Sequence, residues 1–309
     1  MDLFYGDIPL CYTKSLAMAL SSYGYNIYPE YLEGIMVMGN GASIVSNDSK
    51  HPLVFFDNGL PDVSISNSLR ILGFTYKEFF TNSLNNIQVN EIKEKLKYLL
   101  TYGSVVAGPI DMGYLTYNPN SINLSGVDHF VSIYDVDEEF VYLHDPAGYP
   151  CMKIVFKEFI EAWKASLIDY KRGSFSMWGK FKKVKTPNSE KIFHEVSLIM
   201  KKRYQKGENN VIEKFAHAVR DNGLNQEQKQ ILQFFSFRLA SARNLYISKF
   251  LKSHDSNKSK IKEQLAELFG QAHLSTLKED YFNLAHTLEE IAQLDEEFKA
   301  LCLQIEGED

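Results

Sequence analysis

The distribution of proline and glycine along the chain limits its fold more than any other feature. All nine prolines and 14 of the 18 glycines precede Ser189. After that residue there is no proline, and apolar residues recur at spacings of three and four, as at Leu284 and Leu288. Such spacing is typical of amphipathic helices, whereas short apolar runs between turn residues are typical of mixed α and β structure. The sequence therefore predicts an α+β domain, residues 1–185, followed by an all-helical domain, residues 189–309.

Within the first domain the pattern predicts helices first and then an antiparallel sheet. The connection Val136-Asp137-Glu138-Glu139 is short and acidic, and it separates two apolar runs that should pair as a hairpin. The linker between the two domains is expected in Lys180–Ser189, which is rich in lysine and contains the last proline. We expect helices at residues 12–23, 64–72 and 89–102, a short helix starting near Pro29, and strands at residues 74–77, 104–110, 129–135 and 140–144.

Composition excludes several classes of protein. The net charge is -6 with a pI near 5.8, and no long basic run is present, so nucleic acid is not expected as a partner. No apolar stretch approaches the ~18–20 residues that cross a bilayer, and the acidic N-terminus does not resemble an export signal. The three cysteines, Cys11, Cys151 and Cys302, are widely spaced, which is typical of a protein in a reducing compartment. Their spacing does not match a zinc-binding motif. We expect a cytoplasmic protein without a metal, a cofactor or a membrane partner.

Cys11 is the first residue that could carry chemistry. It immediately precedes a predicted helix, where the helix dipole and the amide groups of the first turn favour a thiolate. The amides of Cys11 and Tyr12 could also receive an oxyanion. Free cysteine is also among the most buried residue types, so an inert packing role is the alternative.

His129 and Asp145 are the second and third candidates. His129 opens a predicted strand after a polar loop, and Asp145 ends the next strand. Because the two strands should form a hairpin, Asp145 is expected to return close to His129. Taken singly, His129 is better explained as a structural histidine, and Asp145 as the cap of an Asp-Pro turn. Taken with Cys11, they supply the base that a thiol needs and the carboxylate that orients the base, in the order found in papain-like folds.

Five short motifs carry a resemblance to a known family. They are Leu10-Cys11-Tyr12-Thr13-Lys14-Ser15-Leu16, Gly39-Asn40-Gly41, Val106-Ala107-Gly108-Pro109-Ile110-Asp111 with Tyr114-Leu115-Thr116-Tyr117, Asp128-His129-Phe130-Val131-Ser132-Ile133-Tyr134, and His144-Asp145-Pro146. With these motifs the chain resembles the butirosin-biosynthesis acyltransferase N-terminal family. The resemblance implies a papain-like cysteine-peptidase fold, and residues 235–303 look similar to the helical C-terminal domain that members often carry.

The resemblance also implies roles for individual residues. Cys11 matches the nucleophile, His129 the base and Asp145 the orienting acid. Asp111 matches a recurrent acid in a segment that continues into Tyr114, and both are expected to bind substrate. The oxyanion would be held by the backbone at Cys11 and Tyr12, with the Asn40 side chain as a further donor. The chain departs from relatives at Leu10, where they often have histidine.

The function expected from the residues and the resemblance together is acyl transfer. The namesake of the family moves an acyl group from an acyl carrier protein to the amine of an aminoglycoside, which implies a carrier-protein donor, a small amine acceptor and a role in antibiotic or other secondary metabolism. A papain-like peptidase or amidase, in which water resolves the same intermediate, uses the same three residues and remains open. A non-catalytic binding module remains open as well. The helical domain is expected either to pack against the first domain or a second subunit, border the cleft and shape the acceptor site, or to be a purely structural or dimerising appendage that forms a homodimer.

Overall fold

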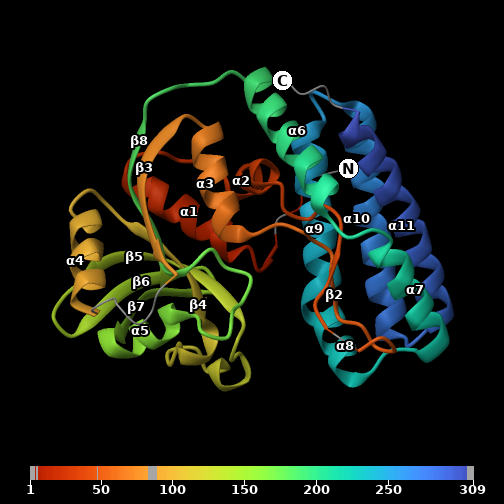
Figure 1. The fold of residues 1–309 in the computed structure, drawn as a ribbon, viewed down its shortest axis with the longest axis horizontal. Helices are drawn as coiled ribbons and strands as arrows, with labels where there is room; N and C mark the ends of the chain where they lie inside the picture. Colours follow the sequence, from red (N-terminus) through yellow and green to blue (C-terminus); the bar gives the residue numbers. More distant parts are fainter. Residues whose placement is uncertain (1–3, 5, 47, 83–88, 305–309) are drawn as a thin grey trace. The chain divides into compact units, whose positions relative to one another are not determined.

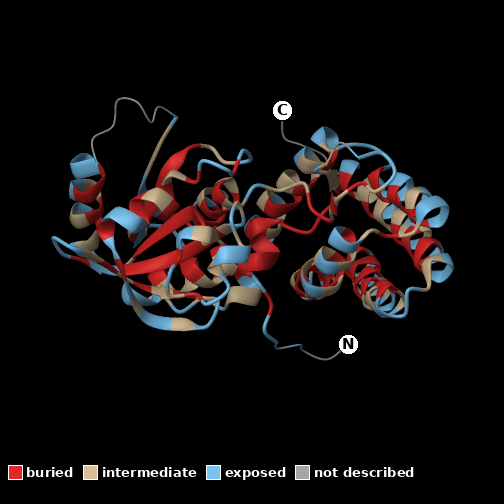
Figure 2. Ribbon diagram, turned by 90° about the horizontal axis from the view of Figure 1, so that it is seen from below, coloured by how far each residue is buried: buried red, intermediate tan, exposed pale blue. Residues whose placement is uncertain are grey.

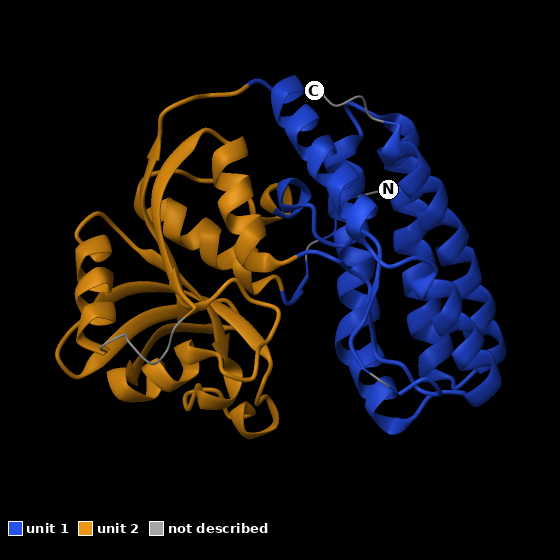
Figure 3. Ribbon diagram, in the orientation of Figure 1, with its two compact units in different colours: residues 1–9, 33–59, 188–309 blue, residues 10–32, 60–187 orange. Residues whose placement is uncertain are grey.

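The computed structural model describes residues 4, 6–46, 48–82 and 89–304 of the 309 (Figure 1). The chain divides into two compact units (Figure 3). The sheet unit contains residues 10–32 and 60–187, and the helical unit contains residues 1–9, 33–59 and 188–309. Each unit is described by itself below.

The sheet unit is built on one antiparallel sheet of six strands in the order β3-β8-β4-β5-β6-β7. Strands β5 and β6 pair as the hairpin that the acidic connection predicted, with Ser132 opposite His144. Asp137 closes the turn, because its carboxylate accepts hydrogen bonds from the amides of Glu139 and Phe140. The strands are β3 (Phe74–Thr81), β4 (Val105–Asp111), β5 (Asp128–Val136), β6 (Phe140–Asp145), β7 (Tyr149–Val155) and β8 (Ser174–Lys183).

Helices cover both faces of this sheet. Val131 lies in an apolar core shared with α4 and α5, whereas the neighbouring Phe130 contacts Tyr12 of α1. Because successive strand residues point to opposite faces, α1 and the α4–α5 pair lie on opposite faces of the sheet. The interior strands β4 and β8 are buried along most of their length, whereas the edge strands β3 and β7 are mostly partly exposed (Figure 2). The helices are α1 (Cys11–Ser22), the first half of α2 (Pro29–Met36), α3 (Pro61–Ile71), α4 (Val89–Leu100) and α5 (Phe156–Lys164), with short 3-10 turns η1 (Met112–Tyr114) and η2 (Ser121–Asn123) after β4.

The α+β class with an antiparallel sheet is confirmed, as is the helical character of the C-terminal part. Three elements of the sheet unit, β7, α5 and β8, have no counterpart in the sequence prediction. Strand β8 lies in the interior of the sheet between β3 and β4 and runs to Lys183, so Lys180–Lys183 is strand and not linker.

The helical unit is not a continuous C-terminal segment. Residues 33–59 belong to it, although the sequence analysis placed them with the first domain. The reason is aromatic packing: Phe56 lies 4.9 Å from Phe269, 5.4 Å from Phe237 and 6.3 Å from Phe215, ring centre to ring centre. The elements are the end of α2, the paired short strands β1 (Ser43–Ile44) and β2 (Val54–Phe55), α6 (Ser189–Lys206), α7 (Val211–Asn222), α8 (Gln226–Ile231), a π-helical turn η3 (Leu232–Ser236), α9 (Phe237–Leu251), α10 (Ser256–Leu277) and α11 (Tyr281–Leu303).

A buried ion cluster also ties residues 33–59 to the helices. The Arg243 guanidinium on α9 lies 3.0 Å from a Glu33 oxygen and 3.1 Å from an Asp57 oxygen. All three side chains are nearly inaccessible, and Asp57 also lies 3.7 Å from Arg203, so removing one member would upset the charge balance of a buried group. In the part of the chain that the structure describes, no helix has the length and apolar character that a membrane crossing requires.

Candidate active site

Cys11 is the first residue of α1, and its side chain is partly exposed. Two contacts hold this end of α1 against β5. The Ser15 hydroxyl donates to the Phe130 carbonyl at 2.9 Å, and the Tyr12 ring packs edge-on against the Phe130 ring. Leu10 is 2% exposed and occupies the cap position, where no side chain of the described residues caps the helix. The helix start therefore presents its thiol beside the strand that carries His129.

His129 and Asp145 form a buried pair. Because β5 and β6 are antiparallel neighbours, the start of β5 and the end of β6 meet at one edge of the sheet. There His129 Nε2 lies 2.7 Å from Asp145 Oδ1, and the two side chains are 5% and 0% exposed. The hairpin geometry expected from the sequence thus brings these two residues together.

The His129 ring also interacts with Cys11. Burial alone would lower the pKa of His129, but hydrogen bonds from Asp145 and Cys11 and the charges of both residues outweigh it and raise the pKa to about 10. Since Asp145 occupies Nε2, Nδ1 is the ring nitrogen left for the thiol. His129 thus interacts with both Asp145 and Cys11, and we call the three residues the Cys–His–Asp cluster.

Asp145 is held in place by two further donors. The Tyr117 hydroxyl donates to Asp145 Oδ2 at 2.8 Å, and the Ala147 amide donates to Oδ1 at 2.7 Å. Burial would raise the pKa of Asp145, but the His129 hydrogen bond and charge, with the Ala147 and Tyr117 hydrogen bonds, lower it overall. The sequence analysis assigned no role to Tyr117, because nothing in a loop of 3-10 turns marks one tyrosine as the partner of a distant carboxylate.

A second tyrosine lies beside the cluster. The Tyr170 hydroxyl donates to Asp128 Oδ1 at 2.7 Å. Burial raises the pKa of Tyr170, and the charges of Asp128 and Cys11 raise it further. Tyr170 is 47% exposed, so its ring reaches solvent near the thiol. The sequence analysis also missed this residue, which lies in the irregular segment between α5 and β8.

The side chains of two of the four expected oxyanion or substrate residues are engaged in contacts within their own units. The Tyr12 side chain is 3% exposed and packs on Phe130, so only its backbone is available for the expected role. Asn40 belongs to the helical unit, where its side-chain nitrogen donates to the carbonyls of Val37 and Met38, each at 3.3 Å. The Asn40 side chain is thus engaged in its own turn.

The other two lie in the loop after β4. Asp111 ends β4, and its Oδ1 accepts from the amides of Gly113 and Gly126, both at 2.9 Å. Its Oδ2 is buried and meets no hydrogen-bond partner among the described residues. Asp111 therefore fixes the two ends of the loop that carries Tyr114, which is 45% exposed.

The remaining cysteines lie in different surroundings. Cys151 is exposed, and its amide donates to Nδ1 of His144, a ring that points away from the buried Asp145 side of β6. Cys302 is buried on α11, and burial raises the pKa of its thiol to about 12. Over the described ranges, no three or more His, Cys, Asp or Glu side chains gather as a metal site would require.

Together these features describe an α+β protein with a Cys–His–Asp cluster and a helical unit. Residues 203–303 match the model of the YobF C-terminal domain. The whole chain is 31% identical, over 313 residues, to the uncharacterized protein YobF of Bacillus subtilis (strain 168), and the match covers 99% of each chain. The chain therefore belongs to the YobF family.

Proposed function

We propose that the protein is a cysteine-dependent acyltransferase of papain-like fold, with Cys11 as nucleophile, His129 as base and Asp145 as the orienting acid. One observation carries the proposal: the buried His129 ring is hydrogen-bonded to Asp145, and the Cys11 thiol lies close enough to raise the pKa of the same ring. A thiol, a base within hydrogen-bond reach and a group that orients the base are the three parts that nucleophilic catalysis requires.

In the first step the Cys11 thiolate attacks the carbonyl carbon of an acyl thioester. A bond forms between Sγ and this carbon, and the carbonyl electrons move to its oxygen. The start of α1 favours the resulting negative charge, since helix N-termini attract anions. When the carbonyl re-forms, the donor sulfur leaves and takes a proton from the His129 imidazolium. The raised pKa of His129 keeps that proton available at neutral pH.

In the second step an amine attacks the acyl-enzyme. The nitrogen bonds to the carbonyl carbon, neutral His129 accepts a proton from the nitrogen, and the Cys11 sulfur leaves as a thiolate. The product is an amide, and the imidazolium–thiolate pair is restored. Asp145 keeps the ring orientation through both steps, because Tyr117 and Ala147 fix its carboxylate.

The resemblance to the butirosin-biosynthesis acyltransferase family supports the choice of substrates. It favours an acyl carrier protein as the thioester donor and a small amine-bearing metabolite as the acceptor, within secondary metabolism. A peptidase or amidase would use the same residues and differ only in the group that resolves the intermediate. The experiment must therefore separate transfer from hydrolysis.

The test is an intact-mass measurement on the full chain after mixing with an acyl-pantetheine thioester. We expect one acyl group per chain, mapped by peptide analysis to Cys11 and absent in Cys11→Ala. Cys151→Ser is the matched control, since it removes an exposed thiol outside the cluster. Acyl groups that appear equally on Cys11 and Cys151 would count against an activated thiol, and no adduct or turnover with any thioester would favour a non-catalytic module.

Adding an amine to the acyl-enzyme distinguishes an acyltransferase from a peptidase or amidase. We expect primary amines to accelerate loss of the adduct and to appear as amides in the small-molecule fraction. Loss at the same rate with and without amine, with free acid as the product, would identify a hydrolase.

A further inference from the structure

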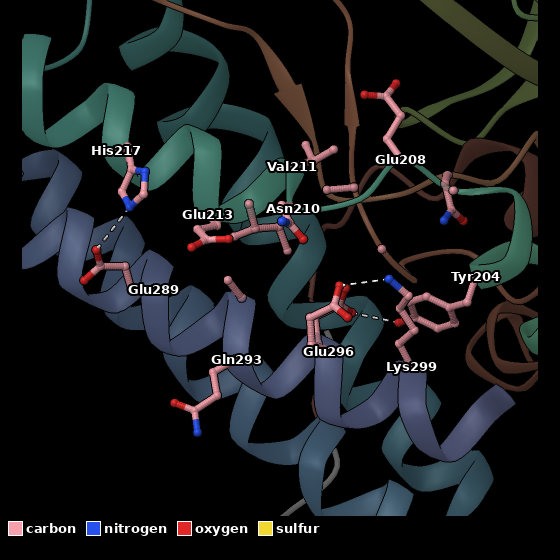
Figure 4. Close-up of a pocket in the computed structure, with 17 residues that line it drawn as sticks. Tyr204, Glu208, Asn210, Val211, Glu213, His217, Glu289, Gln293, Glu296 and Lys299 are labelled. Carbon is pink, nitrogen blue, oxygen red and sulfur yellow. Dashed lines mark hydrogen bonds and ion pairs between the residues drawn. The ribbon is translucent and has the colours of Figure 1, made fainter. Parts of the chain in front are cut away.

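The helical unit contains a cavity of about 380 Å³ between the α6–α7 connection, α7 and α11 (Figure 4). Its walls carry carboxylates that are partly or largely exposed, and two of them already have cationic partners, Glu289 with Arg220 and Glu296 with Lys299. Nothing in the described part of the chain marks a ligand for this cavity, so we assign none to it.

In the sheet unit, the segment that joins α5 to β8 presents two large apolar side chains to solvent. Leu167 is 63% exposed and Tyr170 is 47% exposed, whereas Ile168 between them is fully buried. Single exposed apolar residues are ordinary on a protein surface, but two in one short irregular segment form a small apolar surface. We call Leu167 and Tyr170 the apolar shelf.

Four contacts hold this segment in place. The Lys171 ammonium donates to two carbonyl groups of the segment itself. The Arg172 amide donates to Asp62 Oδ2 on α3 at 2.7 Å, and the Arg172 guanidinium lies 3.1 Å from Glu78 Oε2 on β3. The segment is therefore bonded to itself and to two neighbouring elements, and it holds the apolar shelf in one position, as a binding surface requires.

The apolar shelf lies against the start of β5, beside the Cys–His–Asp cluster. A Cβ built on Gly126 would lie 3.6 Å from the Leu167 Cβ, and the Tyr170 hydroxyl donates to Asp128 Oδ1 at 2.7 Å. Gly126 and Asp128 are two residues apart, so their Cα atoms lie within about 7 Å of each other, immediately before the histidine of the cluster. The charge of Cys11 also contributes to the raised pKa of Tyr170. The apolar shelf therefore borders the thiol.

The apolar shelf offers apolar contact and no free hydrogen-bond donor. The one proton of the Tyr170 hydroxyl is donated to Asp128, and Leu167 has no polar side-chain atom. A polar group placed against Leu167 would lose its water without gaining a partner there, which costs free energy. An apolar chain would instead remove apolar surface from water on both sides of the contact, which is favourable.

Among the groups that reach the site in the proposed reaction, the acyl chain fits this surface best. In the acyl-enzyme its first carbon is bonded to the Cys11 sulfur, so the rest of the chain stays beside the thiol through both steps. The donor's thiol arm leaves after the first step. The acceptor brings an amine, whose nitrogen needs polar partners that the apolar shelf does not supply.

We propose that the apolar shelf is the acyl-chain subsite of the protein, and that the acyl group it takes is an apolar chain longer than acetyl. This inference rests on the proposed function and adds to it the class of acyl group that is transferred. It also assigns Leu167 and Tyr170 as residues that determine specificity for the donor.

The rate of pantetheine release from S-acyl-pantetheine thioesters by the full chain tests the proposal. Release reports the first step, whether an amine or water then resolves the acyl-enzyme. Acetyl-, butyryl- and hexanoyl-pantetheine are compared below saturation. Because the apolar shelf covers one side of the chain, each methylene should raise the rate about twofold, roughly half the free energy of full burial. We therefore expect hexanoyl-pantetheine to react at least about tenfold faster than acetyl-pantetheine.

Substitutions of Leu167 test the contact itself. Leu167→Ser should lower the hexanoyl-to-acetyl ratio of rates at least about threefold, whereas Leu167→Met, which keeps an apolar side chain of similar size, should preserve the ratio. Val184→Ser is the matched control, because Val184 is 51% exposed and follows the opposite end of β8. This control should leave the ratio unchanged.

The outcomes separate this inference from the proposed function. Equal rates with the three thioesters in the wild type would overturn the subsite and leave acyl transfer standing. An equal fall in the ratio for Leu167→Ser and Val184→Ser would also overturn the subsite, since it would show a general effect of surface substitution. No release above that of Cys11→Ala with any of the three thioesters would overturn acyl transfer itself, and the subsite with it.

Discussion

Replacing His129 with glutamine and Asp145 with asparagine, singly and together, measures how strongly the two buried side chains are coupled. In such a double-mutant cycle, the coupling energy is the difference between the stability loss of the double variant and the sum of the losses of the two single variants. The His129–Asp145 pair has a separation of 2.7 Å with side chains 5% and 0% exposed. A buried hydrogen bond to a charged group contributes ~1.5–3 kcal/mol, so we expect a coupling of ~2 kcal/mol.

A surface pair provides the matched control. Lys164 and Glu161 approach to 2.6 Å, but their side chains are 33% and 43% exposed. Solvent screens such a pair, and its coupling should be roughly 0.5 kcal/mol. The two pairs have nearly equal N–O distances but differ in burial. Burial alone should therefore account for the difference between their coupling energies.

The sign of the pH dependence follows from the two pKa shifts. The pKa of His129 is raised to about 10, so its stabilisation is complete below the ordinary value of ~6.5 and is lost as pH rises through about 10. The pKa of Asp145 is lowered, so its contribution is present above ~3.9 and is lost as pH falls through the lower folded value. The coupling should therefore be largest near pH ~6.

The assay is urea unfolding at that pH, followed by tryptophan fluorescence. The only tryptophans of the chain, Trp163 and Trp178, both lie in the sheet unit, so the signal reports on the unit that contains the pair. A coupling for His129–Asp145 no larger than that for the surface pair would refute the reasoning. So would a coupling that grows as pH rises toward 10.

Three further substitutions test single contacts. Tyr117→Phe removes a hydroxyl donor from Asp145 and should destabilise the sheet unit by ~1–2 kcal/mol in the same assay, with slower alkylation of the Cys11 thiol. An unchanged alkylation rate would show that the tyrosine does not position the carboxylate. Ser15→Ala leaves the Phe130 carbonyl without this donor and should cost ~1 kcal/mol, a loss that would be absent if the start of the helix were held by packing alone. Arg243→Ala removes the guanidinium that lies between Glu33 and Asp57 and should destabilise the helical unit by ~3–5 kcal/mol, measured by circular dichroism. A loss below ~1 kcal/mol would contradict the buried ion cluster.

The sequence predicted the central hairpin because its signals are local. Apolar residues at the alternating positions Val131 and Ile133 and the acidic turn after Val136 together specify which strand ends meet. That was enough to expect Asp145 beside His129. The position of α1 is not local, since it depends on the contact of Ser15 and Tyr12 with Phe130, more than 100 residues away.

Other features could not be predicted, for identifiable reasons. Strand β8 is buried on both faces, and a lysine and a glycine interrupt its apolar pattern, so it gives neither the period of a strand nor that of a helix. Residues 33–59 join the helical unit through Phe56 and the Arg243 ion cluster, both of which are long-range contacts. Asn40 was expected near the oxyanion on the basis of resemblance, but its amide is engaged by the turn in which it lies.

Alkylation by iodoacetamide at pH ~6, with each cysteine followed separately by peptide mass spectrometry, tests the central claim most directly. An ordinary thiol, with a pKa of about 8.5, is almost fully protonated at this pH and reacts slowly. Cys151 is the internal control, because it is exposed and lies outside the Cys–His–Asp cluster. We predict that Cys11 reacts at least about tenfold faster than Cys151 and that His129→Ala abolishes the difference. Equal rates at the two cysteines in the wild type, or an advantage of Cys11 that survives His129→Ala, would contradict the account.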